Sequence, residues 1–272
     1  MGIRIGCGSW SDDAYRELLY PPGTPAAGRL SWYAKHFDHV EVNSSYYATP
    51  RPEATAKWVK QTPERFLFDI KLHRAFSQNP EKTAQEGKLI RLLLQGVKPL
   101  IREKKLGVFL LLLDPRFGPD KHGLEELDAL TKALQPHRLA VELRHIDWVR
   151  GKQRGQTFDF FRERKLVWVT VDMPRIAGSN LLSPLYEVTN PDLAYLRLHG
   201  RNPDYLKAKT ADARHAYLYP PGEIRSLARR IRTLADEAKE VRVVANNHHK
   251  DFAPRTALAL ERLVNVTSRK EA

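Results

Sequence analysis

Eight short apolar runs rich in β-branched and aromatic residues recur along the chain, and segments with helical periodicity separate them. The runs occupy residues 3–10, 39–47, 66–73, 105–113, 138–145, 167–174, 193–200 and 241–249. Apolar residues three or four positions apart predict helices over residues 29–37, 53–61, 83–103, 124–134, 158–164, 223–239 and 255–264. Strands that alternate with helices indicate right-handed crossovers and a parallel sheet.

Eight such units in 272 residues favour an α/β fold, a closed (β/α)8 TIM barrel in one domain of residues 1–272. An open doubly wound sheet is the alternative. Residues 175–191 lack helical periodicity, which predicts an irregular crossover after the sixth strand. Residues 201–222 predict a long loop after the seventh strand, a candidate lid at the end where TIM barrels carry their sites. Residues 266–272 are expected to form a flexible tail.

Basic residues are in excess, with 45 Lys and Arg against 32 Asp and Glu and a formal net charge of +13. This excess favours an anionic small molecule or a nucleic acid as partner, although it can equally serve only to keep the surface soluble. The single cysteine, Cys7, excludes an internal disulfide and a Cys-rich zinc site and fits a reducing cytosol. No apolar run approaches the roughly 18 residues of a membrane span, so we expect a soluble cytoplasmic protein without a membrane partner.

Charged side chains interrupt the strands in a regular way. Because side chains alternate between the two faces of a strand, Val141, Leu143 and His145 share one face while Glu142 and Arg144 share the other. If the apolar face packs on the outer helices, Glu142 and Arg144 point into the barrel. The same division in other strands predicts an interior that holds Glu41, Asn43, Asp69, Lys71, His73, Thr170, Asp172, Tyr195, Arg197, His199, Asn246 and His248.

Such an interior is unusual, because branched apolar side chains normally fill a TIM barrel. An unpaired buried charge costs several kcal/mol or forces the group to become neutral. The acidic and basic members could neutralise one another almost completely, so the cluster is either an ion-pair network that ties the strands together or a functional site. Its position at the carboxyl ends of the strands favours the second interpretation.

Motifs over nearly the whole chain resemble those of the YecE-like proteins, domain-of-unknown-function family 72. They read RIGCGSW, YPPG, EVNSSYY, FDIKLHR, VELRHIDW, VDMP, YLRLHGR and ANNHH, in that order. The resemblance implies a TIM barrel but no established activity. The matching positions are Trp10, Glu41, Asn43, Tyr47, Lys71, Glu142, Arg144, His145, Trp148, Asp172, Arg197, His199, Gly200, Arg201, Asn246 and Asn247.

The chain departs from the family pattern in two places. Leu112 and Asp114 stand where the family usually has a Gln and the first of two Pro residues, and Ser77-Gln78 replaces a usual Thr-His pair. A chemistry that depends on those polar side chains would be altered or lost here.

Two kinds of site fit these residues. A divalent metal, Zn or Mn, could be held by Glu142, Asp172, His199, His73 and Glu41, although the nearby Lys and Arg side chains oppose a cation. An anion could instead be gripped by Arg144, Arg197, Arg201 and Lys71, with His199 or Glu142 as general acid or base. The aromatic residues Trp10, Tyr46, Tyr47 and Trp148 could stack on a ring or serve only as packing. Cys7 is expected to be a small core residue rather than a nucleophile.

The sequence therefore favours a hydrolase or lyase that acts on a phosphorylated or nucleic-acid substrate. Its predicted catalytic residues are Glu142, His199, Asp172 and Lys71. Its predicted substrate-binding residues are Trp10, Glu41, Asn43, Tyr47, His73, Arg144, Arg197, Arg201, Asn246 and Asn247. The alternative is a non-catalytic barrel that binds an anion or nucleic acid and whose charged interior is an ion-pair network.

Overall fold

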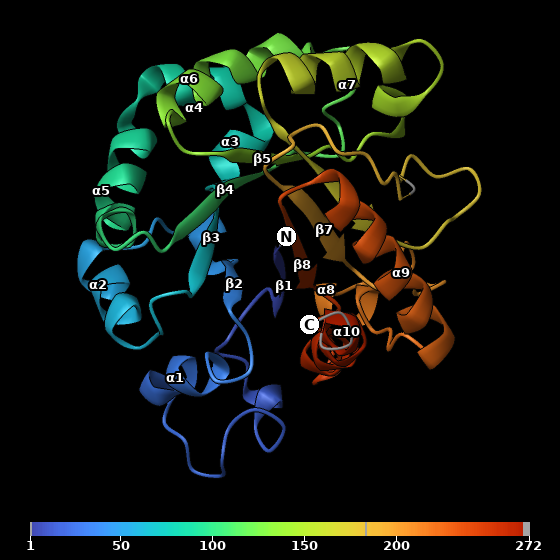
Figure 1. Ribbon diagram of the computed structural model, residues 1–272. Coiled ribbons are helices and arrows are strands. Elements are labelled where there is room, and N and C mark those ends of the chain that lie inside the picture. Colours follow the sequence, from blue (N-terminus) through green and yellow to red (C-terminus); the bar gives the residue numbers. More distant parts are fainter. Residues whose placement is uncertain (1, 183, 269–272) are drawn as a thin grey trace.

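Eight parallel strands close into a barrel in the computed structural model, which describes residues 2–182 and 184–268 (Figure 1). Each strand pairs with the next one in the chain, and the last pairs with the first. The strands are β1 (Gly2–Cys7), β2 (His39–Val42), β3 (Leu67–Lys71), β4 (Leu106–Leu112), β5 (Leu139–Glu142), β6 (Val167–Asp172), β7 (Ala194–Leu198) and β8 (Glu240–Ala245). The predicted single-domain (β/α)8 barrel is confirmed.

Helices form a ring around the strands, with α2 and α5 on the left of Figure 1, α7 at the top and α9 on the right. In chain order they are α1 (Arg29–Tyr33), α2 (Pro52–Lys60), α3 (Arg74–Gln78), α4 (Pro80–Glu86), α5 (Lys88–Arg102), α6 (Asp128–Leu134), α7 (Gln153–Glu163), α8 (Ala211–Arg214), α9 (Pro221–Glu237) and α10 (Phe252–Ser268). Their apolar stripes pack on the outer face of the barrel, as the periodicity predicted. In the two described ranges, no helix is long and apolar enough to cross a membrane.

The helix predicted over residues 83–103 is two helices, because Gly87 adopts a left-handed conformation with φ of +67°. Glycine takes this conformation without steric cost and commonly ends a helix there. The short helices α3 and α8 were not predicted from periodicity. Of the predicted tail, residues 266–268 continue α10, and residues 269–272 lie outside the described residues.

The crossover between β6 and β7 contains no helix in its described residues, as predicted. The crossover lies along the outer face of β6, where other strands are covered by a helix. Trp168 Nε1 and Thr170 Oγ1 donate hydrogen bonds of 3.0 and 2.7 Å to the Leu185 carbonyl, and Thr189 Oγ1 donates one of 2.8 Å to the Leu166 carbonyl. These bonds replace the packing that a helix would supply.

The register of the barrel shows which side chains point inward, because paired residues of parallel strands share a face. Val171 pairs with Arg197, and Arg197 pairs with Val244. Arg197 contacts Glu41 across the barrel, so Val171 points inward and Thr170 and Asp172 point outward. The predicted inward orientation of Thr170 and Asp172 is therefore wrong. Both faces of β6 are buried, so apolar alternation could not distinguish them.

Candidate anion site at the barrel mouth

Charged side chains fill the barrel in two layers. The layer at the amino-terminal end is balanced: Asp69 accepts hydrogen bonds from Arg242 and from the Val108 N–H, and Glu240 Oε1 accepts from Arg242 Nε at 2.9 Å and Arg4 Nε at 3.1 Å. Burial raises the pKa of Asp69 to about 6, although Arg242 opposes this effect. These two carboxylates and two guanidinium groups form a chain of ion pairs, and Asp69 Oδ2 is buried without a hydrogen-bond partner in the described residues.

The upper layer is centred on Arg197. Its Nε and Nη2 donate hydrogen bonds of 2.9 and 2.6 Å to the two oxygens of Glu41, and its Nη1 donates to Glu142. Arg144 Nε donates a 3.0 Å hydrogen bond to the other oxygen of Glu142. Burial favours the neutral form of Glu142, but Arg197 and Arg144 hold the pKa of this carboxyl well below its usual range. Glu142 is therefore a fixed carboxylate.

Two asparagines extend this layer toward β1. Asn43 Nδ2 donates hydrogen bonds of 2.9 Å to the Gly8 carbonyl and 3.3 Å to Asn246 Oδ1, and Asn246 Nδ2 lies 3.5 Å from Glu41 Oε1. A Cβ atom at Gly8 would lie 2.3 Å from Asn246 Oδ1, so glycine is required for this approach. The inward orientation predicted for Asn43 and Asn246 is confirmed.

Lys71 is the cation of the upper layer that has no counter-ion. Within residues 2–182 and 184–268 its amine makes no hydrogen bond or ion pair, and it lies 4.4 Å from the centre of the Tyr46 ring. Burial, reinforced by Arg197, lowers the pKa of Lys71 to about 8. Lys71, Arg144 and Arg197 thus oppose only the carboxylates of Glu41 and Glu142, which leaves one positive charge over at neutral pH.

Three histidines lie beside this cluster. His199 Nε2 is 3.8 Å from Glu142 Oε2, and its Nδ1 is buried without a partner in the described residues. Its ring centre lies 5.3 Å from that of His215, which in turn lies 5.9 Å from that of His248. Burial lowers the pKa of His199 and of His248 to about 3, so both rings are neutral at pH 7. The histidines therefore do not alter the charge balance.

A cavity of about 290 Å³ opens next to Arg144, above β5 and β6. Met173 and Leu182 contribute to its apolar wall, while Arg144, Arg214 and Tyr205 contribute polar groups. Arg214 makes no ion pair in the part of the chain that the structure describes. The mouth therefore offers a second cation without a carboxylate partner.

Asp172 and Arg201 lie outside the barrel wall and not in this cluster. Arg201 donates hydrogen bonds of 2.8 and 2.7 Å to the two oxygens of Asp172, and its Nη1 is 3.2 Å from Glu223 Oε1. The Tyr219 hydroxyl donates a 2.9 Å hydrogen bond to Asp172 as well. These contacts tie the loop after β7 to β6 and α9.

Three further predicted residues are engaged elsewhere. Trp10 packs on Trp58 of α2, with ring centres 5.2 Å apart, on the outer side of the barrel. Asn247 Nδ2 donates hydrogen bonds to the Tyr217 carbonyl and to Thr256 Oγ1, at 2.9 and 3.0 Å, and so joins the loop to α10. Tyr47 is 72% exposed. The structure therefore does not bring these residues together with Arg197.

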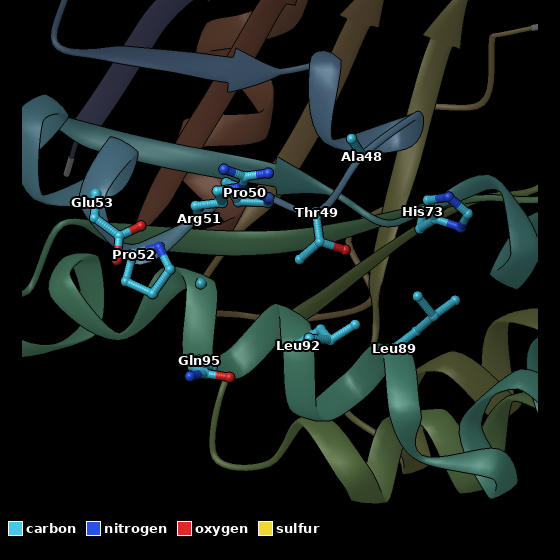
Figure 2. Close-up of a pocket in the computed structure, with 11 residues that line it drawn as sticks. Ala48, Thr49, Pro50, Arg51, Pro52, Glu53, His73, Leu89, Leu92 and Gln95 are labelled. Carbon is cyan, nitrogen blue, oxygen red and sulfur yellow. The ribbon is translucent and has the colours of Figure 1, made fainter.

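His73 belongs to a different pocket, an open one of about 480 Å³ between the β2–α2 loop and α5. Figure 2 shows His73 near Leu89 of α5 and Thr49 of the loop. Its Nδ1 accepts a 3.3 Å hydrogen bond from the Ala75 N–H and caps α3. β3 ends at Lys71, so strand alternation no longer governs His73.

The predicted metal ligands are not gathered either. Asp172 and His73 lie away from the upper layer, and Arg197 already binds Glu41 and Glu142. The described residues contain no group of three or more His, Cys, Asp or Glu side chains arranged to hold a metal ion.

Sequence reasoning missed four groups. Arg242, two residues before the inward Val244, could have been found from the alternation in β8. Tyr205, Arg214 and His215 reach the mouth from the long loop, and no periodicity predicts their positions.

Leu112, one of the departures from the family pattern, lies at the site too, because Leu112 pairs with Glu142 in the barrel register. Arg197 and Arg144 are the partners that satisfy that carboxylate.

The fold and the site together define a (β/α)8 barrel with a polar site at the carboxyl ends of its strands, the face that bears the functional sites of such barrels. The model of a family described as "Protein of unknown function DUF72" matches residues 4–272, and the chain belongs to this family.

Relatives agree with this assignment. The UPF0759 protein YunF of Bacillus subtilis is 26% identical over 257 residues, which cover 90% of this chain and 89% of the relative. The UPF0759 protein YecE of Escherichia coli is 29% identical over 161 residues, 58% of this chain and 54% of the relative. The crystal structure of a DUF72 family protein from Enterococcus faecalis has a TM-score of 0.87 and 33% identity, covering 97% of this chain and 95% of that one. One from Thermotoga maritima has a TM-score of 0.84 and 27% identity, covering 97% and 100%.

Proposed function

We propose that the barrel mouth binds a phosphorylated substrate and that the protein is a hydrolase or lyase acting on it. The observation that carries this proposal is the unmatched positive charge of Lys71 above the two arginine-bound carboxylates. A partly buried cation without a counter-ion is costly, and a bound anion removes that cost. The second unpaired cation at the mouth, Arg214, suits a phosphate monoester, which carries close to two negative charges at neutral pH.

Each residue of the cluster then has a distinct role. Arg144 uses Nε for Glu142, and its terminal nitrogens remain available to two phosphate oxygens. Lys71, with a pKa of about 8, can give or take a proton near neutral pH. His199 offers a neutral imidazole with an unpaired Nδ1. Glu41 and Glu142 are positioning residues, because both are already bound by arginine.

A panel of phosphate monoesters and diesters tests the proposal. Phosphate release and isothermal titration are measured for the wild type and for Lys71→Met, with Lys98→Met on the exposed side of α5 as the matched control. We expect Lys71→Met to lose turnover and to weaken binding at least tenfold, roughly one paired charge, while Lys98→Met behaves as the wild type. Binding that depends on Lys71 without any turnover would support the non-catalytic anion-binding barrel instead. No binding and no turnover across the panel would overturn both.

A further inference from the structure

The cavity beside Arg144 differs in character from the charged layer that it adjoins. Val171, Met173, Leu181, Leu182 and Leu206 give it an apolar wall. Met173 and Leu182 are buried, whereas Leu206 is 57% exposed at the rim. An apolar wall that meets a few polar groups is typical of small-molecule sites, so this wall is a candidate contact surface.

The wall is held in place by the main chain. Leu181 forms an isolated antiparallel bridge with His145, and the Ile146 N–H donates a 3.2 Å hydrogen bond to the Asn180 carbonyl. These contacts fix the crossover after β6 against the loop after β5. The cavity is therefore preformed, as small-molecule sites usually are.

Charged and aromatic groups join the cavity to the site described above. Arg144 belongs to both, since its Nε binds Glu142 while its side chain lines the cavity. The ring of Tyr205, which also lines the cavity, lies 5.7 Å from that of His215, and the His215 ring lies 5.3 Å from that of His199. An anion bound by Arg144 would therefore lie beside the apolar wall and near Tyr205 and His215.

We infer that the substrate of this site is a small amphipathic anion, in which a phosphate is joined to a single aromatic ring or a branched alkyl group. This inference rests on the proposed function and narrows its substrate. The anionic group would lie between Arg144 and Arg214, and the apolar group would lie against Met173 and Leu182. A volume of about 290 Å³ lies at the lower end of the range for small-molecule pockets and accommodates a ring together with its phosphate.

Three probes that carry a phosphate and differ in the group attached to it test the inference by isothermal titration. They are inorganic phosphate, glycerol phosphate, whose body is polar, and phenyl phosphate, whose body is apolar. Burying one ring should make phenyl phosphate bind roughly tenfold to hundredfold more tightly than the other two. Equal affinity of the three probes would overturn the inference and leave the proposed function standing.

A double variant shows whether the phenyl ring binds in the cavity. Leu181→Ser/Leu206→Ser removes two partly exposed leucines from the wall, and Leu92→Ser/Leu218→Ser removes two exposed leucines elsewhere, at 45% and 46% exposure, as the matched control. We expect only the first variant to weaken phenyl phosphate, by about tenfold, with inorganic phosphate unchanged. Tight phenyl phosphate binding that this variant leaves intact would overturn the inference. Failure of all three probes to bind the wild type would overturn the proposed function together with it.

Discussion

Arg197 binds two buried carboxylates at once, so its removal would leave both without their main counter-ion. Arg197→Met should lower the free energy of unfolding by about 3–5 kcal/mol, because two buried carboxyl groups, Glu41 and Glu142, would lose the guanidinium that they share. Urea unfolding measures this loss. Arg255→Met, which removes an exposed ion pair with Asp251, is the control and should change stability far less than Arg197→Met. A loss for Arg197→Met as small as that of the control would contradict this account of the upper layer.

Replacement of Lys71 is expected to have the opposite effect on stability, because its amine is partly buried and has no partner in the described residues. Lys71→Met should leave the free energy of unfolding unchanged or raise it, while anion binding is lost. Lys105 is the matched control: its Nζ donates hydrogen bonds to the Val59 carbonyl and to two oxygens of Thr62, at 2.9, 2.7 and 3.0 Å. Lys105→Met should therefore destabilise the fold by about 2 kcal/mol. Chemical unfolding of both variants tests this, and a comparable loss in Lys71→Met would mean that Lys71 is structural.

At the scale of the element, the sequence predicts a strand more reliably than the face that each side chain takes. Alternation correctly placed Glu41, Glu142 and Arg197 inside, because their neighbours are apolar and pack on helices. It failed in β6, where Thr170 and Asp172 find partners on the outer side. Those partners come from a crossover and a loop that have no periodicity of their own.

The sequence also fails to predict which segment packs against a given position of a helix. α5 carries Gly96, which on propensity alone would be better as alanine. A Cβ atom there would lie 2.0 Å from the Pro50 carbonyl oxygen, so the loop before α2 can approach α5 only at a glycine. The sequence contains the glycine, but its neighbour is known only from the fold.

Two glycine substitutions separate the steric effect of an added Cβ atom from the gain in helix propensity. Gly96→Ala should destabilise the protein by about 1–3 kcal/mol, because Pro50 must move away. Gly155→Ala in α7, where a Cβ atom meets nothing within 4 Å, should stabilise it by about 0.5–1 kcal/mol. Thermal unfolding of the two variants gives both signs. A stabilising Gly96→Ala would contradict the close approach of Pro50, in the loop before α2, to α5.

At the scale of the whole molecule, closure of the barrel is what creates the site. Glu41 and Arg197 are 156 residues apart in sequence, and they meet only because β2 and β7 face each other across the interior. Strand alternation and barrel geometry predicted that both side chains point into the barrel, whereas their pairing is known only from the structure. The positions of Tyr205, Arg214 and His215 could not be predicted, since they depend on how the loop of residues 201–222 folds back over the mouth.

Burial of neutral histidines also links the site to the stability of the whole protein. His248 has a pKa of about 3 in the fold against an ordinary 6.5, so the unfolded chain binds more protons than the native one between these values. Its contribution to stability is complete above about pH 6.5 and is lost as the pH falls toward 3. The raised pKa of Asp69, about 6, acts in the opposite direction, because the native state holds a proton there that the unfolded chain releases.

His248→Gln measures the contribution of His248 to the pH dependence of stability separately from that of Asp69. Above pH 7 the variant and the wild type should differ by a constant free energy of unfolding, which serves as the internal control. Below about pH 6.5 the wild type should lose stability relative to the variant by about 1.4 kcal/mol per pH unit, since glutamine takes up no proton. Urea unfolding from pH 7.5 to 4.5 measures the difference. If it does not change with pH, His248 is not held neutral by its burial beside His215.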